Sequence, residues 1–313
     1  MINTDKKIVF MCGALRSGSS VFHLMLDCHP DIENPGEFDF LFDLVSDDGV
    51  VPDIDFYHNW LSMHRIFQSK SLIIDESLDY MDLIASFIDQ LIVNSSVLVL
   101  NIHRGFQRIP FLFPNAMYIH LIRDPRDVAR SSIGMGWAGN VYYGTQHWAN
   151  SEKGWKQLEA KTSAGQFYQI RFEDLIISPK KILTDVCGFI GVQYSDQMMS
   201  YAQSSTYSKP DSSLVNQWKT RLSVKEVQLV EFKVKGLMLD LGYKLSGEPF
   251  ISIGCVELVW LKISNKVFRF KFALKRYGIR LYFYEYFSRV FRFDSMNKQA
   301  RMAMNEVNKG LLK

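Results

Sequence analysis

Hydrophobic and polar residues follow two alternating patterns along the chain. Short, continuously apolar runs, each bounded by polar or glycine residues, occupy 7–13, 96–102, 117–122 and 166–172. Runs of this length are typical of buried strands in a parallel sheet. After the first run, Val21, Leu24, Met25 and Cys28 recur at helical spacing before Pro30. The alternation predicts an α/β fold with a mostly parallel sheet flanked by helices.

The longer segments between these strands indicate further helices. Residues 38–95 and 132–160 are expected to be mainly helical, and a helix after the turn at Ser178-Pro179 is expected to end at Gly191. One more amphipathic helix is expected to end before Gly242. Trp148 and Trp155 are expected in the core, whereas the glycines around Trp137 favour a loop.

The octet GALRSGSS, Gly13 to Ser20, lies between the first predicted strand and the first predicted helix. It has the frame of the Walker A phosphate loop, G-x-x-x-x-G-K-[ST], with Ser19 in place of the lysine. Backbone N–H groups at a helix start bind anions, so this context favours a P-loop-like phosphate site. The alternative is a glycine-containing turn in which serine caps the helix.

Composition places the charge of the chain at one end. The chain has 313 residues, 47% of them apolar, and a net charge of +3, so it suits one large domain, alone or with an appendage. Residues 260–293 hold nine Lys/Arg, twelve aromatic residues and one acid, Glu285, a local charge of +8. The rest of the chain therefore carries −5, and the basic character belongs to the C-terminus.

The cysteines and the N-terminus favour a cytoplasmic protein. Cys12, Cys28, Cys187 and Cys255 form no C-x-x-C pair and no zinc spacing, so we expect buried, reduced thiols. The N-terminal apolar stretch is too short for a signal peptide, because it reaches Arg16. No uncharged apolar run of about 18 residues is present to span a membrane.

Three segments together resemble the sulfotransferase family, which uses 3′-phosphoadenosine-5′-phosphosulfate (PAPS). LRSGSS, from Leu15, resembles the 5′-phosphosulfate loop, and FPNAMYIHLIRDPRDVARS, from Phe113, resembles the 3′-phosphate element. QIRFEDLIISPKKILTDVCGFIG, from Gln169, resembles the segment that follows them. The order and spacing carry the likeness, which spans about residues 7–245 and is nearest to bacterial and tyrosylprotein-type members.

The resemblance implies which residues bind the donor. PAPS has no γ-phosphate and the family needs no metal, which explains the absent Walker lysine. Arg16 would hold the 5′-phosphate with its planar fork. The neighbouring loop residues Ser17, Gly18, Ser19 and Ser20 would supply further donors. Arg123 at a strand end and Ser131 in the next helix would contact the 3′-phosphate. The alternative for Arg123 is a polar turn in which the acids and arginines of RDPRD pair with one another.

The resemblance offers two candidates for the general base. Glu37, after HPDIENPG, resembles the base of tyrosylprotein and bacterial glycan-type members, and His103 resembles the histidine that ends the second strand in cytosolic members. The alternatives are a solvated loop acid and a solvent-facing histidine. The sequence departs from the family at two places where relatives usually carry a lysine. Near His103 the chain has Arg104 and no lysine, and before Trp218 it has Gln217.

The C-terminal region is expected to form a separate helical, basic and aromatic appendage. We predict a catalytic domain over residues 1–249 and an extension over 250–313. This extension either packs its aromatic residues on the catalytic domain, or lies on an anionic membrane through residues 260–293, or binds an acidic glycan or another subunit. No recognised nucleic-acid module supports nucleic-acid binding.

These patterns predict a PAPS-dependent sulfotransferase that acts by in-line displacement on an acceptor hydroxyl of a saccharide, glycolipid or other small metabolite. The alternatives are a P-loop kinase-like phosphotransferase, which the missing Walker lysine disfavours, and a non-catalytic nucleotide-binding scaffold. We expect a cytoplasmic enzyme, peripheral on the inner face of the membrane if the extension binds lipid. The oligomeric state and the acceptor are not determined by the sequence.

Overall fold

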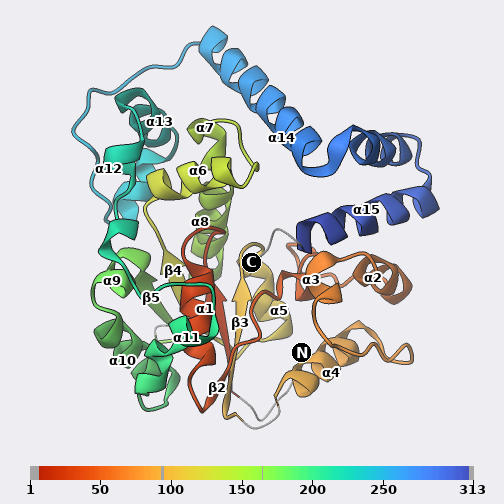
Figure 1. Cartoon of the computed structure of the whole chain (residues 1–313). Helices are drawn as coiled ribbons and strands as arrows, with labels where there is room; N and C mark the ends of the chain where they lie inside the picture. The colour runs from red at the N-terminus through yellow and green to blue at the C-terminus, as the bar shows by residue number, and fades with distance from the viewer. Residues whose placement is uncertain (1–6, 93–94, 164, 310–313) are drawn as a thin grey trace.

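The computed structural model describes residues 7–92, 95–163 and 165–309. Within these ranges lies a five-stranded sheet in the order β2-β3-β1-β4-β5, and every pairing is parallel (Figure 1). The strands are β1 Lys7–Cys12, β2 Ile32–Glu33, β3 Val97–Ile102, β4 Met117–Ile122 and β5 Phe167–Arg171. The predicted α/β fold and its four apolar strands are confirmed. The two-residue strand β2 was not predicted, because it is too short to show a periodicity.

Helices surround the sheet and continue beyond it. They are α1 Ser19–Asp27, α2 Ile54–Leu61, α3 Arg65–Gln68, α4 Tyr80–Leu91, α5 Ile109–Leu112, α6 Pro125–Gly134, α7 Val141–Gly144, α8 Gln146–Glu159, α9 Phe172–Ile177, α10 Pro179–Ile190, α11 Tyr201–Ser204, α12 Trp218–Arg221, α13 Val224–Asp240, α14 Cys255–Val290 and α15 Asp294–Lys309. Short 3₁₀ segments are η1 Asp39–Leu41, η2 Phe106–Arg108, η3 Asp196–Met199 and η4 Ser212–Leu214.

Alternate residues of β1 face opposite sides of the sheet. Phe10 and Cys12 pack into a core with α2, α4 and α5, whereas Val9 and Met11 pack into a second core with α1, α9 and α10. Successive side chains of a strand point to opposite faces, and both faces of this sheet are covered. This double coverage explains why the strands appear in the sequence as continuously apolar runs.

Most predicted helices are present, with one overestimate. The helix expected before Gly242 is α13, which begins with a capping box between Ser223 and Glu226. Residues 38–95 are less helical than expected, because loops occupy 42–53 and 69–79. In the first of these loops, Gly49 adopts a φ of 89°, a turn conformation that helical periodicity does not detect.

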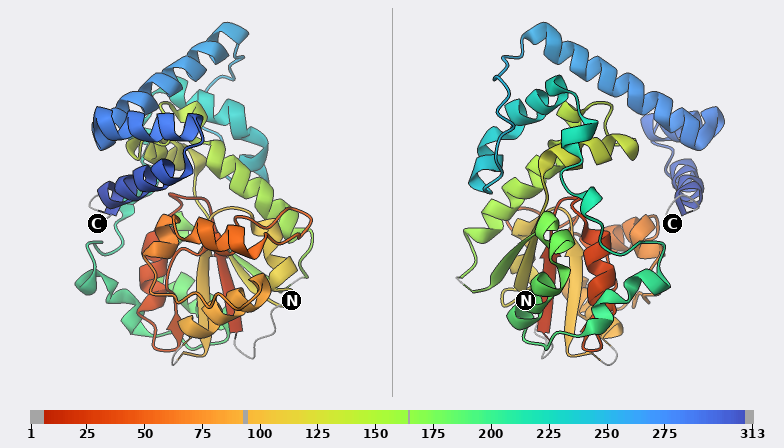
Figure 2. Two further views of the ribbon diagram at one scale, coloured as in Figure 1. Left: turned by 90° about the vertical axis from the view of Figure 1, so that its right-hand side faces the viewer. Right: turned by 60° about the vertical axis from the view of Figure 1, so that its left-hand side comes forward.

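The C-terminal extension is helical, as expected. α14 contains a break at Gly278, where φ is 74° and ψ is 160°. Its first half packs on the loop before α7, where the Asn265 side chain accepts a hydrogen bond from the backbone N–H of Gly139 at 2.7 Å. α15 then returns beside α3 (Figure 2), where Asn305 donates to the backbone oxygen of Met63 at 3.3 Å. The domain boundary at 249/250 stays a prediction.

Single residues bear out most of the expected burial. Trp148 and Trp155 are in the core, and Trp137 lies partly exposed in a loop. The cysteines are free, and Cys12 and Cys187 are buried. Cys255 is exposed at the first turn of α14, so the expectation of burial is wrong for this residue. No helix within the described ranges is both long and apolar enough to cross a bilayer. Parts of the predictions for the N-terminus, the helical region and the tail lie outside the described residues, at 1–6, 93–94 and 310–313.

Candidate functional site

The octet Gly13–Ser20 forms the turn between β1 and α1, at the carboxyl edge of the sheet. Gly13 lies so close to β4 that a Cβ atom would meet the Leu121 oxygen at 2.6 Å. Gly18 adopts the left-handed conformation with a φ of 94°, and no side chain caps the first turn of α1. The backbone N–H groups at this helix start therefore remain available to an anion.

Two further features of the loop fit a bound anion. The Ser17 hydroxyl is buried and has no hydrogen-bond partner among the described residues. An unpaired buried hydroxyl is costly, so a bound phosphate oxygen would satisfy it. Arg16 has a φ of 72°, a conformation that non-glycine residues rarely adopt and that often marks functional loops. The loop is therefore compatible with the phosphate group that the sequence predicts.

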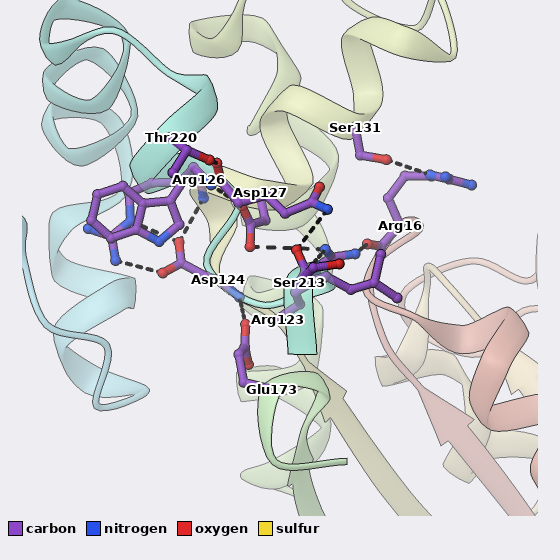
Figure 3. A network of polar contacts seen from close by, with 12 residues as sticks. Arg16, Arg123, Asp124, Arg126, Asp127, Ser131, Glu173, Ser213 and Thr220 are labelled. Atoms are coloured by element: carbon purple, nitrogen blue, oxygen red, sulfur yellow. Dashed lines mark hydrogen bonds and ion pairs between the residues drawn. The ribbon is translucent and has the colours of Figure 1, made fainter. Parts of the chain in front are cut away.

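Arg16, Ser131 and Arg123 lie together, although they are far apart in the sequence. The Nε of Arg16 donates to the Ser131 hydroxyl at 2.8 Å, and the Arg123 Nη1 donates to the backbone oxygen of Arg16 at 3.2 Å (Figure 3). Within the described part of the chain, no carboxylate forms a salt bridge with Arg16. Its guanidinium is therefore free of a competing anion.

Arg123 is held behind the loop by its own contacts. Its guanidinium lies 4.2 Å from the Phe172 ring centroid, and its Nη2 donates to the backbone oxygen of Leu214 at 3.1 Å. Burial lowers the pKa of Arg123, while the Asp127 carboxylate, 4.0 Å from Nη2, acts in the opposite direction. The Arg123 Nε is buried without a partner among the described residues, which leaves one donor for a ligand.

The rest of the RDPRD element is structural. Arg126 is buried and pairs with Asp124 at 2.6 Å (Figure 3), and it also pairs with Glu231 of α13 at 2.8 Å. Its guanidinium also lies 3.6 Å from the Trp218 ring centroid. The pairing expected for Asp124 and Arg126 therefore holds, and it fixes α6 against α13. Removing one partner would leave a buried charge without compensation.

The two candidate bases face each other. Glu37 follows the turn at Gly36 and pairs with Asn101 near the end of β3, while His103 follows that strand directly. The His103 Nδ1 lies 2.8 Å from the backbone oxygen of Gly13, and its Nε2 lies 3.7 Å from a Glu37 carboxylate oxygen. A carbonyl only accepts, so Nδ1 donates and Nε2 is turned to Glu37.

Electrostatics favour a charged Glu37–His103 pair. Burial alone lowers the pKa of His103, but the Glu37 and Asp39 carboxylates close to its ring offset that effect, and the pKa is raised above its usual 6.5. The ionic contact with His103 lowers the pKa of Glu37 below 4.5, against the effect of burial. In this state only the carboxylate of Glu37 has a lone pair with which to accept a proton.

Asp39 and Arg104 support this pair from behind. The buried Asp39 carboxylate accepts hydrogen bonds from the backbone N–H groups of His103 at 2.7 Å and Arg104 at 3.2 Å. Arg104 donates through Nε and Nη2 to Asp43, each at 2.6 Å. Its guanidinium is therefore paired with carboxylates. Asp39 was not among the predicted site residues, because an acid two residues after Glu37 carries no pattern of its own.

A cavity of about 410 Å³ joins the loop to the candidate base. Residues from α1, α3 and the loop around Pro35 line it, and those with polar side chains include Ser19, Ser20, His23, Glu37, Arg65, Ser69, Lys70, Asn101 and Lys309. Lys70 donates to the backbone oxygen of Pro35, and burial lowers its pKa. Arg65 and Lys70 were not predicted, since neither lies in a recognisable motif. This cavity brings Ser19 and Ser20 of the loop and the carboxylate of Glu37 to one space.

Residues outside the predicted site set also lie near the loop. His147 lies with its Nε2 3.1 Å from the backbone oxygen of Leu15, and burial lowers its pKa. Trp137 packs edge-on against His147 at 5.8 Å between ring centroids. Gln217 and Lys219 lie beside Trp218, away from the cavity lining. Among the described residues, no group of three or more His, Cys, Asp or Glu side chains is arranged to hold a metal ion.

Comparisons with known sequences indicate the family of this chain. A family model described as "Sulfotransferase family" matches residues 9–196. A Caenorhabditis briggsae protein named "Putative protein-tyrosine sulfotransferase" is 25% identical over 217 residues, covering 64% of this chain and 71% of the relative. An "Uncharacterized protein" of Aquifex aeolicus (strain VF5) is 23% identical over 219 residues, covering 63% of this chain but 27% of its own length.

Solved structures show the same fold. The sulfotransferase domain from the curacin biosynthetic pathway superposes with a TM-score of 0.61 at 19% identity, covering 78% of this chain and 100% of that domain. The sulfotransferase domain from the Synechococcus PCC 7002 olefin synthase gives a TM-score of 0.56 at 20% identity, covering 74% and 96%. The family model matches more than half of the chain, and this protein belongs to the sulfotransferase family.

Proposed function

We propose that this chain transfers the sulfuryl group of PAPS to a hydroxyl group of an acceptor by in-line displacement. The observation that carries the proposal is the shared cavity, in which Ser19 and Ser20 of the phosphate loop and the carboxylate of Glu37 line one space. A donor held at the loop and a hydroxyl placed at Glu37 would then approach each other. Positioning of this kind supplies much of the catalysis in related phosphoryl transfers.

The loop is assigned the 5′-phosphosulfate. The backbone N–H groups of residues 17–20 and the hydroxyls of Ser17, Ser19 and Ser20 would donate to its oxygens. Arg16 would offset the charge that grows on the 5′-phosphate as it leaves, because its guanidinium has no carboxylate partner among the described residues. Arg123 and Ser131 are assigned to the 3′-phosphate, and the contacts of both with Arg16 support placing the two phosphates side by side.

Glu37 is assigned the role of general base. In the transfer, the acceptor oxygen forms a bond to sulfur, the bond between sulfur and the bridging 5′-phosphate oxygen breaks, and the hydroxyl proton passes to Glu37. A sulfate ester and 3′-phosphoadenosine-5′-phosphate (PAP) result. His103 would hold the Glu37 carboxylate in place and keep it ionised, since the pKa of Glu37 is lowered by that contact.

Donor binding is tested by calorimetry. The full chain should bind PAP at least about tenfold more tightly than AMP, because only PAP carries the 3′-phosphate assigned to Arg123 and Ser131. Equal affinities for PAP and AMP would contradict this assignment. Transfer activity should also persist in EDTA, whereas a strict magnesium requirement would favour a P-loop kinase-like enzyme.

The acceptor is proposed to be a saccharide, a glycolipid or another small metabolite with a free hydroxyl, and the enzyme is proposed to work in the cytoplasm at the membrane surface. The support is an apolar stripe on α14, formed by Val256, Val259, Trp260, Ile263 and Val267, all exposed. These residues recur at spacings of three and four, so they share one face of the helix.

Charge complementarity favours an anionic lipid surface over a second copy of the chain. At 100° per residue, Lys262 and Lys266 flank one edge of the stripe, and Lys271 and Lys275 flank the other; all four are exposed. Cations on both edges with apolar residues between them are typical of helices that lie in a membrane interface. Two copies would instead bring together surfaces that each carry +8 over residues 260–293.

A further inference from the structure

A second cavity lies between the C-terminal helices and the sulfotransferase core. Its volume is about 610 Å³, and it is enclosed by α3, the loop after α6, both halves of α14 and the end of α15. Its lining includes Arg65, Trp137, Lys266, Arg269, Phe270, Phe272, Arg276, Tyr277 and Tyr282. Most of these residues lie outside the matched family segment, 9–196, so the cavity is a feature that the C-terminal extension adds.

The charges that line this cavity are all positive. Arg65, Lys266, Arg269 and Arg276 contribute side chains, and no acid is found among the described residues that line it. None of the four forms a salt bridge within the described part of the chain; Arg276 instead donates to the backbone oxygen of Met135 at 3.4 Å. Four unpaired cations around one space repel each other and create a strong positive potential, which a bound anion would relieve.

The remaining walls are aromatic. Trp137, Phe270 and Tyr282 line the cavity together with Phe272 and Tyr277. Phe272 lies so close to the loop that a Cβ atom on Gly136 would meet its ring at 2.2 Å. The loop and α14 therefore pack in direct contact at this point. Aromatic walls bind apolar or ring-shaped groups well, so an occupant needs an apolar body as well as an anionic group.

The cavity adjoins the space that contains Glu37. Arg65 lines both cavities, and the successive α15 residues Asn308 and Lys309 line one each. Trp137 also contacts His147, whose ring reaches the backbone of the phosphate loop at Leu15. A molecule bound against α14 can therefore extend past Arg65 toward Glu37.

We propose that this cavity binds the non-reacting part of the acceptor, and that the acceptor is an anionic amphiphile. Its anionic group, a phosphate, sulfate or carboxylate, pairs with Lys266, Arg269 and Arg276, and its apolar part lies against the aromatic walls. Its hydroxyl extends to Glu37, where the transfer occurs. The inference rests on the proposed sulfuryl transfer for this last step, but binding of the amphiphile does not depend on it.

The direct test is titration of the full chain with dodecyl phosphate below its micelle concentration, with inorganic phosphate and dodecyl maltoside as comparisons. Dodecyl phosphate should bind at least about tenfold more tightly than either, because only it offers charge and an apolar chain together. Equal binding of dodecyl maltoside would show an apolar site without charge selection and would overturn the proposal. Equal binding of inorganic phosphate would overturn the role of the aromatic walls.

A matched pair of variants locates the site. Lys266→Glu with Arg269→Glu should weaken dodecyl phosphate binding by about thirtyfold or more, since each Lys or Arg beside an anionic group contributes a factor of about five. The control, Lys298→Glu with Arg301→Glu, changes the charge of the C-terminal extension equally at two exposed residues of α15 outside both the cavity lining and the apolar stripe, and should change binding by less than about threefold. Equal losses in both variants would overturn the proposed site. If charge reversal disturbs folding, Lys266→Gln with Arg269→Gln gives the same comparison.

PAP binding separates the two proposals. If PAP binds normally and dodecyl phosphate does not, the acceptor inference fails alone. If dodecyl phosphate binds with the expected pattern and PAP does not bind, the donor assignment fails while the cavity remains an anionic-amphiphile site. Titrations with dodecyl phosphate are therefore run on the free protein and again with PAP present.

Discussion

At the carboxyl edge of the sheet, residues from distant parts of the sequence are held by short hydrogen bonds to the backbone, such as those of His103 to Gly13 and Arg123 to Arg16. The C-terminal helices are attached differently. α14 contacts the core through Asn265 and its neighbours, while the opposite face of its first half presents exposed apolar residues. The proposed donor site therefore lies in the tightly connected region, and the proposed acceptor cavity lies where the attachment is looser.

The largest expected effect is at the sheet edge. Glu37→Gln should lower kcat by about 10²–10⁴ and leave PAP affinity unchanged, because it removes the base but no phosphate contact. Arg16→Ala should weaken PAP binding and the chemical step together. Steady-state kinetics with PAPS and calorimetry with PAP measure the two effects.

The control for this pair is Asp31→Asn, which changes an exposed acid just before β2 and should leave kcat intact. Normal turnover by Glu37→Gln together with an inactive His103→Ala would assign the base to His103 instead.

Glycine substitutions should distinguish global from local loss. Gly18→Ala should lower the unfolding free energy by about 1–3 kcal/mol, because the left-handed conformation and the Phe172 ring, 2.0 Å from the added Cβ, both oppose it. Gly136→Ala should lower this free energy by less, about 1 kcal/mol from its own left-handed φ of 78°, because α14 can move away and relieve the clash with the Phe272 ring. Urea denaturation measures the first effect.

Limited proteolysis of the 241–254 linker measures the displacement of α14 in the Gly136→Ala variant, since detachment of α14 exposes that segment. Gly134→Ala is the matched control, because an added Cβ there meets nothing within 4 Å. Equal cleavage of the Gly136→Ala and Gly134→Ala variants would show that the contact with Phe272 does not hold α14 in place.

Membrane attachment should depend on the extension alone. The wild-type chain should bind anionic vesicles at low salt and release as the Debye length shrinks from about 10 Å at 0.1 M to about 3 Å at 1 M. Ile263→Ser with Val267→Ser should weaken vesicle binding by about tenfold, because burial of apolar surface in the interface is lost. Flotation with anionic and neutral vesicles measures this.

Ile73→Ser with Ile177→Ser removes exposed apolar side chains elsewhere and should bind like wild type. No binding of the wild-type chain to anionic vesicles at low salt would refute the membrane proposal. A dimer that is lost only in the stripe variant would assign the stripe to a second copy of the chain.

The smallest expected effect is a pH dependence at the Glu37–His103 pair. The folded-state pKa of His103 is raised above 6.5, so its contribution to stability is full below pH 6.5 and is lost as the pH rises through the folded pKa. The pKa of Glu37 is lowered below 4.5, so its contribution is present above pH 4.5 and is lost as the pH falls through the folded pKa. Both contributions are therefore fully present between pH 4.5 and pH 6.5.

Urea denaturation of wild type and Glu37→Gln at pH 5.5 and pH 8.5 tests the pair. The difference in unfolding free energy should be larger at pH 5.5 by about 1 kcal/mol or less, a small value because the Glu37 side chain is 38% exposed. His64, whose pKa burial lowers to about 4, changes stability in both proteins and cancels in the difference. A difference that grows toward pH 8.5 would rule out the charged pair.

Local pattern alone determined the frame of this protein. The apolar runs predicted β1, β3, β4 and β5, and the glycine frame after β1 predicted the turn into α1, because strand burial and helix starts depend on neighbouring residues. Short or irregular elements were missed for the same reason. β2 has two residues, and the loops within 38–95 follow from turn conformations at positions such as Gly49.

Only the tertiary structure decided which residues meet. Glu37 and His103 were alternatives in the sequence, and the parallel pairing beside β3 turns them into neighbours 3.7 Å apart. The amount of aromatic and basic residues in α14 was plain from the sequence, but which face packs on the core and which faces solvent was not. Contacts between distant segments, such as Asn265 with Gly139, fix that choice, and helical periodicity carries no information about them.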